Sequence, residues 1–302
     1  MTIVLVLAVY AALLAVPAPV ALRDAGWAVR APGLAIALWQ ALCASSVLSV
    51  LVAGFALAVL SRRAGVALAG AGLTIAVIAC VGRGFVSAGV RARRQALRHA
   101  ETVTLIGQPM PELGADGVEG PEAVMVDHPR AAAYCLPGRQ RHRRIVVTTG
   151  ALRTLGAPQL RAVVAHEQAH LRGRHHLVLL AAHTFALAFP GVPLFRYARS
   201  EVAALVEMRA DDVAARQHGR VALVTALLGV ADGTGPGAAL TAGGPAAVRR
   251  MRRMLIPPRP LCLPARAAGV VGAACSVAFP LGLACCPVTV SVYFAVRAFQ
   301  LA

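Results

Sequence analysis

Long uncharged apolar runs, separated by short polar connections, dominate this 302-residue chain, and one long polar segment interrupts the pattern. Each apolar run reaches the roughly 20 residues that a helix needs to cross a bilayer. The runs cover Thr2 to Leu22, Leu34 to Leu60, Ala64 to Gly82 and Ala267 to Val296. The pattern therefore predicts four transmembrane helices and an integral membrane protein that is mainly α-helical.

The polar segment divides the chain into three parts. Residues 1–90 hold the first three spans, residues 91–264 form the polar domain, and residues 265–302 hold the fourth span and a short tail. The polar domain contains 23 arginines against 12 acidic residues, and the cluster "RARRQALRH" directly follows the third span. Because basic residues near span ends favour the cytoplasmic side, we expect the polar domain to be cytoplasmic. The protein is then a multi-pass protein of the plasma membrane with both termini outside.

Composition supports a membrane protein and argues against two other classes. The chain is 58% hydrophobic and only 14% charged, with a mean hydropathy of +0.68. Its net charge of +17 would suit nucleic acid, but aromatic residues make up 5% and none interleave with arginine as a stacking surface would. Seven cysteines include no CxxC pair, which argues against a cysteine-based zinc site. We expect contact with the lipid bilayer and no direct contact with nucleic acid.

Within the polar domain, short strands precede a helical stretch. Short stretches separated by turn-forming proline and glycine predict strands at 123–127, 131–137 and 143–149. Thr149 is predicted to cap a first helix, and Pro158 suits the first turn of a second helix that Gly173 closes. The glycine-rich stretch at 231–247 is expected to be a flexible loop. The domain is therefore of the α+β class.

The motif "HEQAH" lies on this second predicted helix. His166 and His170 are four residues apart, so their side chains lie about 5 to 6 Å from each other and can bind one ion. Glu167 is offset by about 100° toward the open side of that ion, where it can take a proton from water. Chance produces such a motif on the order of once in a hundred chains of this composition. The motif predicts one catalytic Zn²⁺ ion.

A third ligand is expected from the segment "VEMRADDVAAR" at 206–216. Glu207 is assigned to zinc, and Asp211, one turn further, is predicted to orient a ligand histidine from outside the metal shell. Glu201 and Asp212 are weaker rivals. The competing interpretation is a solvated acidic helix face.

A topological condition accompanies this assignment. Residues 177–195 are uncharged and separate His170 from Glu207, so a single membrane crossing here would place the two ligands on opposite sides. Pro190 and Pro193 interrupt the segment after about thirteen apolar residues, which suits a buried or re-entrant helix rather than a span. His175, His176 and His183 are left out of the metal shell.

These motifs together resemble the BlaR/MecR-type membrane metallopeptidases, which are gluzincins with a cytoplasmic zinc domain. The resemblance includes the stretch "TTGALRTLGAPQLRAVVAHE", the later "EMRAD", and "VRRMRRMLIPPRPL" before the last span. It implies zinc ligands at His166, His170 and Glu207 and a general base at Glu167. It implies a gluzincin-type α+β domain inserted between the third and fourth transmembrane helices.

The resemblance also implies regulatory proteolysis of a cytoplasmic repressor of the BlaI/MecI type. The antibiotic-sensing members carry an extracellular penicillin-binding domain that we expect this chain to lack, so external sensing would require a separate sensor partner. A second copy of the chain, in a homodimer, is the other partner considered. One alternative is a membrane-protein quality-control or processing peptidase of the HtpX or CAAX-protease type. Another is a membrane scaffold without catalysis. The leading hypothesis is a zinc endopeptidase that aligns protein or peptide substrates on an edge strand near residues 131–136.

Overall fold

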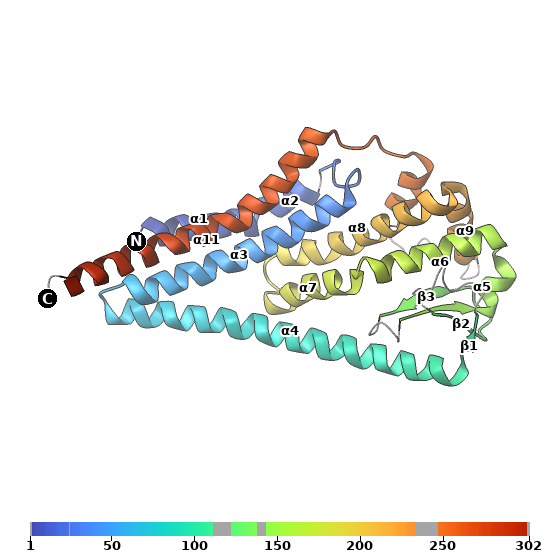
Figure 1. The fold of residues 1–302 in the computed structure, drawn as a ribbon, viewed down its shortest axis with the longest axis horizontal. Helices are drawn as coiled ribbons and strands as arrows, with labels where there is room; N and C mark the ends of the chain where they lie inside the picture. The colour runs from blue at the N-terminus through green and yellow to red at the C-terminus, as the bar shows by residue number, and fades with distance from the viewer. Residues whose placement is uncertain (1, 24, 111–121, 138–142, 233–246, 301–302) are drawn as a thin grey trace. The chain divides into compact units, whose positions relative to one another are not determined.

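The computed structural model describes residues 2–23, 25–110, 122–137, 143–232 and 247–300 (Figure 1). The described chain is mostly helical. Its contacts separate it into two compact units. The first comprises Met1–Ala88, Ala181–Val202 and Pro260–Ala302, and the second comprises Gly89–Leu180 and Ala203–Arg259.

The first unit is built from long apolar helices. These are α1 (Thr2–Ala15), α2 (Pro17–Arg23), α3 (Pro32–Leu60), the first part of α4 (Ala64–Ile106) and α11 (Leu263–Gln300). Among the described residues, four helical stretches are long and apolar enough to cross a membrane, judged by length and composition: Thr2–Arg23, Pro32–Leu60, Ala64–Val103 and Leu263–Cys285. They coincide in place with the four runs predicted from sequence.

Small and polar residues join these helices. Gly54 of α3 and Gly70 of α4 face each other so closely that a Cβ on Gly70 would lie 2.6 Å from the carbonyl oxygen of Gly54. Such small residues let membrane helices approach each other. The Tyr10 hydroxyl of α1 donates to the Ser276 carbonyl of α11 at 2.9 Å, and Ser45 of α3 donates to the same oxygen. α3 therefore contacts α1, α4 and α11.

Two helix boundaries differ from the sequence prediction. The first span is broken after Ala15, because Pro17 has no N–H to donate and its ring disfavours a helical residue before it. The third helix was expected to end at Gly82, but α4 continues without a break to Ile106. No proline interrupts it, and the alanine, arginine, glutamine and leucine residues beyond Val90 are good helix formers. Its 43 residues make it about 65 Å long.

The second unit contains a four-stranded sheet. Its strands are β1 (Gln108–Pro109), β2 (Glu122–Val126), β3 (Ala133–Leu136) and β4 (Arg144–Thr148), in the order β1-β2-β4-β3. β2 runs parallel to β4, whereas β3 is antiparallel to β4 and lies at the edge of the sheet. The three predicted strands are confirmed, each to within two residues at either end.

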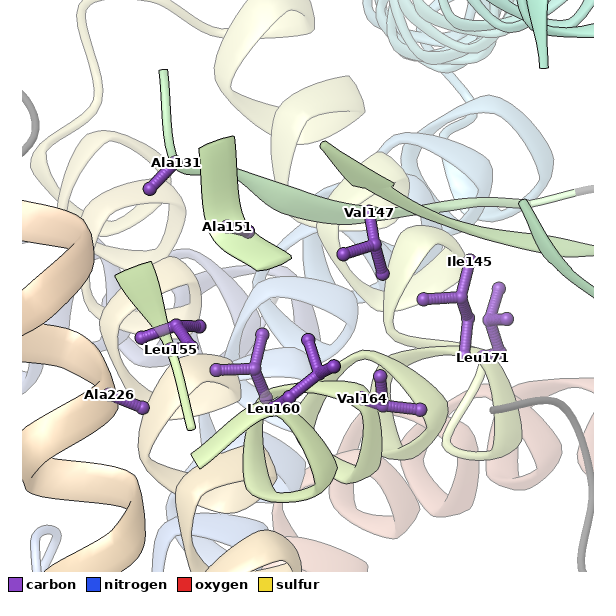
Figure 2. Packing of buried hydrophobic residues seen from close by; sticks show 10 residues of the cluster. Ala131, Ile145, Val147, Ala151, Leu155, Leu160, Val164, Leu171 and Ala226 are labelled. Atoms are coloured by element: carbon purple, nitrogen blue, oxygen red, sulfur yellow. The ribbon is translucent and has the colours of Figure 1, made fainter. Parts of the chain in front are cut away.

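Helices complete the second unit, and some of them pack against the sheet. The helices are α5 (Thr149–Thr154), α6 (Ala157–Arg172), α9 (Arg220–Asp232), parts of α7 (His175–Ala188) and α8 (Pro193–His218), and a helix at residues 247–255. Figure 2 shows Leu160 and Val164 of α6 facing Ile145 and Val147 of β4. Both β4 side chains are fully buried, so the sheet fixes the orientation of α6.

Thr148, and not Thr149 as predicted, caps α5. Its hydroxyl accepts from the Ala151 amide at 3.2 Å and from the Ala132 amide at 2.9 Å, and it donates to the Arg130 carbonyl at 2.7 Å. Thr149 is the first residue of the helix, and its hydroxyl donates to Asp127 at 2.8 Å. α6 begins and ends as predicted, with Pro158 in its first turn and Gly173 as its C-cap.

The apolar segment between the two halves of the predicted metal site folds back. α7 is only 14 residues long, and the chain turns between Phe189 and Val192 before α8 begins at Pro193. This geometry satisfies the condition that the segment must not separate His170 from Glu207. The predicted flexible stretch at 231–247 lies largely outside the described residues.

Candidate metal centre

Helix α6 places the two histidines of the motif side by side. His166 and His170 are one turn apart, and their Nε2 atoms lie 3.1 Å from each other. His166 is 7% exposed, because α6 buries the neighbouring Ala162, Ala165 and Ala169. The helical spacing predicted from sequence therefore produces two converging nitrogen atoms.

Glu207 of α8 supplies the third converging atom. Its Oε2 lies 3.5 Å from Nε2 of His166, and its Oε1 lies 3.5 Å from Nε2 of His170. Ligands about 2.0 to 2.1 Å from a tetrahedral zinc lie about 3.3 Å from each other, which is close to all three separations. Among the described residues these three form a group that could hold a metal ion, as predicted. Three protein ligands leave the fourth position open, as catalytic zinc sites require.

Asp211, also on α8, lies behind the first histidine. Its Oδ1 is 3.1 Å from Nδ1 of His166, although the ring N–H is not directed at it well enough for a regular hydrogen bond. Asp211 is 1% exposed. A buried carboxylate on the outer nitrogen of a ligand histidine fixes the ring orientation, which is the role predicted for Asp211.

Arg250, in the helix at 247–255, was not identified from sequence. Its Nε and Nη2 donate to the two carboxylate oxygens of Asp211, each at 2.8 Å, and its Nη1 lies 3.0 Å from Oε2 of Glu207. The rival Asp212 pairs with Arg253 at 2.6 and 2.8 Å. The converging group thus contains Glu207 and neither Asp212 nor Glu201.

His175 holds the second ligand histidine from outside. Its Nδ1 lies 3.1 Å from Nδ1 of His170, and the residue is 4% exposed. The approach is possible because α6 and α7 are joined only by Gly173 and Arg174, the latter in the left-handed conformation with φ 48°. The exclusion of His175 from the ligands stays a prediction, and sequence reasoning missed its contact with His170.

The acidic side chains around His166 favour a positive charge at this position. Burial opposes a charge on His166, yet Asp211, Glu207 and Glu167 outweigh it and raise the pKa of His166 to about 9. Burial alone would raise the pKa of Glu207, but His166, Arg250 and His170 together hold it below its usual value. Glu207 is therefore ionised and available as a ligand at neutral pH.

Glu167 lies beside the edge strand. Helix α6 contacts β3, and Cys135 of β3 is close enough for its thiol and main chain to lower the pKa of the Glu167 carboxyl group. Burial is the largest influence on Glu167 and raises the pKa of its carboxyl group, against the lowering effects of His166 and Cys135. A carboxylate whose pKa lies above its ordinary value accepts a proton more readily near pH 7, as a general base must.

Similarity to known proteins supports the same chemistry. Residues 100–204, which include the histidine motif, match the sequence model of Peptidase family M48. A stretch of 65 residues is 34% identical to Protease HtpX homolog of Caldanaerobacter subterraneus subsp. tengcongensis and covers 22% of each chain. No solved structure matches. These comparisons show a segment that is similar to M48 peptidases, and the narrower BlaR/MecR assignment stays a prediction.

Proposed function

We propose that this chain is a membrane-embedded zinc endopeptidase with His166, His170 and Glu207 as metal ligands. The observation that carries the proposal is the convergence of these three side chains from α6 and α8, with Glu167 one residue from the first ligand. Bound zinc supplies a Lewis acid that polarises a peptide carbonyl and lowers the pKa of water. Peptidases of family M48 are zinc enzymes, which agrees with this ligand set.

Glu167 acts as the general base in this proposal. Its carboxylate takes a proton from the water that attacks the peptide carbonyl, and it then returns the proton to the leaving amine. Its contact with Cys135 places it next to β3, whose outer edge pairs with no other strand among the described residues. An extended substrate can add to such an edge through main-chain hydrogen bonds, which presents its carbonyl groups beside Glu167.

The variant Glu167→Gln tests this assignment in the full-length protein. We expect it to bind stoichiometric zinc and to lose cleavage by about 100-fold or more, because general bases contribute about 10² to 10⁴ in rate. Gln168→Ala, at the next position of α6, is the matched control and should retain activity. Full activity of Glu167→Gln would refute the mechanism. Stoichiometric zinc in a wild-type protein that cuts no substrate would support the scaffold alternative instead.

The substrate class distinguishes two versions of the proposal. Similarity to an HtpX homolog and the four membrane-length helices favour processing of membrane proteins, whereas the BlaR/MecR resemblance favours cleavage of a cytoplasmic repressor of the BlaI/MecI type. Proteomics of cells that carry wild type or Glu167→Gln separates the two. Fragments of membrane proteins that depend on Glu167 support processing, and fragments of a winged-helix repressor support signalling.

A further inference from the structure

Two arginines tie the helix at 247–255 to α8. Arg253 donates both Nη atoms to Asp212, and Arg250, one turn earlier, binds Asp211 in the same two-pronged manner. Both arginine side chains are largely buried: that of Arg250 is 17% exposed and that of Arg253 is 9% exposed. Each pair has two hydrogen bonds, through Nη1 and Nη2 in Arg253 and through Nε and Nη2 in Arg250. Of the two, it is the Arg250 pair that lies against a candidate metal ligand, Glu207.

Arg250 contacts two different carboxylates at once. Nε and Nη2 bind Asp211, which leaves Nη1 to reach Oε2 of Glu207 at 3.0 Å. A planar guanidinium can hold both groups in fixed directions, whereas an ammonium group is a single point charge. Arg250 therefore fixes the orientation of Glu207 relative to Asp211.

The charges of the site require such a group. Glu167, Glu207 and Asp211 bring three carboxylates close to His166, and their mutual repulsion opposes the compact arrangement. A zinc ion balances two of these charges, and Arg250 balances the third. Without the guanidinium, Asp211 would be a buried carboxylate without its strongest partner and would be free to turn from the His166 ring.

We propose that Arg250 is a positioning residue of the metal centre. It holds Glu207 in the orientation of a metal ligand and keeps Asp211 against the outer nitrogen of His166. The helix at 247–255 thereby becomes part of the metal site, although it supplies no ligand. This inference rests on the proposed function, because it requires that His166, His170 and Glu207 bind zinc.

The matched pair Arg250→Met and Arg253→Met tests the proposal in the full-length protein. Each variant removes one two-pronged arginine–aspartate pair from the same helix, and methionine keeps much of the side-chain length. Removing outer partners of metal ligands lowers metal affinity about 10- to 100-fold, so we expect this loss in Arg250→Met. Arg253→Met should change zinc affinity by less than about 3-fold, since Asp212 contacts no ligand. Zinc affinity is measured by competition with a chromophoric chelator.

Cobalt substitution gives a readout that a purely structural role would not move. The visible spectrum of bound Co²⁺ reports ligand geometry, and it should shift in Arg250→Met but not in Arg253→Met. Arg250→Lys keeps the charge and most of the volume, so it should fold. We expect it to recover part of the zinc affinity while the cobalt spectrum stays altered, because the fork to Asp211 is lost.

The outcomes separate this inference from the proposed function. The positioning role would be overturned if Arg250→Lys had the zinc affinity and the cobalt spectrum of the wild-type protein. It would also be overturned if Arg250→Met and Arg253→Met lost zinc affinity to the same extent. Failure of the wild-type protein to bind zinc would instead overturn the ligand assignment. Circular dichroism confirms that each variant is folded before zinc is added.

Discussion

The variant Gly173→Ala should weaken zinc binding even though Gly173 contacts no ligand. A Cβ atom at this position would lie 2.5 Å from Nε2 and 2.7 Å from Cδ2 of His175, and 3.0 Å from the carbonyl oxygen of Ala169. Contacts this short force one group to move. The Ala169 carbonyl belongs to α6, so the His175 ring must move, and this movement disturbs its 3.1 Å contact with Nδ1 of His170.

The size of the effect follows from two opposing terms. Gly173 has φ −75° and ψ −3°, which alanine adopts freely, so the reduced freedom of the unfolded chain stabilises the variant by about 0.4 to 1 kcal/mol. Overpacking at a buried ring costs about 1 to 3 kcal/mol. The net destabilisation is therefore about 0 to 2.6 kcal/mol, which lowers Tm by up to about 10 °C. Loss of the outer contact to His170 should reduce zinc affinity about 10- to 100-fold.

A double-mutant cycle with His175→Ala is the assay. Zinc affinity and Tm are measured for wild type, both single variants and the double variant. Because alanine at 175 removes the ring that the new Cβ would strike, Gly173→Ala should have little further effect on zinc affinity in that background. An equal loss in both backgrounds, or no loss in either, would refute the role assigned to His175.

Three further predictions concern the cap, the third ligand and the metal. Thr148→Val should lower the stability of the second unit by about 1 to 3 kcal/mol, measured by denaturant unfolding, because the Ala132 amide loses its hydroxyl partner. Glu207→Gln should reduce zinc affinity by more than the roughly 100-fold expected from an outer residue, and equal binding in a chelator competition would exclude Glu207 as a ligand. Chelation of zinc should abolish cleavage and lower Tm by an amount that re-added zinc reverses, since a ligand at 100 times its Kd stabilises by about 2.7 kcal/mol.

Local patterns made part of the fold and site predictable. His166 and His170 converge because helical spacing alone brings them together, and the consecutive apolar residues Ile145, Val146 and Val147 mark the core strand. Pro190 and Pro193 marked the turn that lets Glu207 return to α6. Glu207 could be assigned because few acidic residues lie at helical spacing after the motif.

Other features depend on tertiary contacts that no local pattern reports. Thr148 and Thr149 are both adequate caps by residue type, and the choice between them follows from β4, whose last residue is Thr148. The end of α4 at Ile106 was missed because the uncharged run ends at Gly82, before Arg83, whereas the helix continues through the charged residues that follow. His175 was set aside because it follows Gly173, but that glycine is what allows its ring to reach His170.

Charge balance predicts that the metal site needs a cationic side chain such as Arg250, but it does not predict the position of that side chain in the sequence. Once Glu167, Glu207 and Asp211 are placed around one Zn²⁺ ion, the site carries one uncompensated negative charge, and a buried negative charge requires a cationic partner. That argument predicts an arginine from sequence alone, because the chain contains no lysine. It cannot choose among 30 arginines, since the selected one follows Asp211 by 39 residues. The fold makes the choice, because Arg253 one turn later anchors the same helix and directs Arg250 toward the ligands.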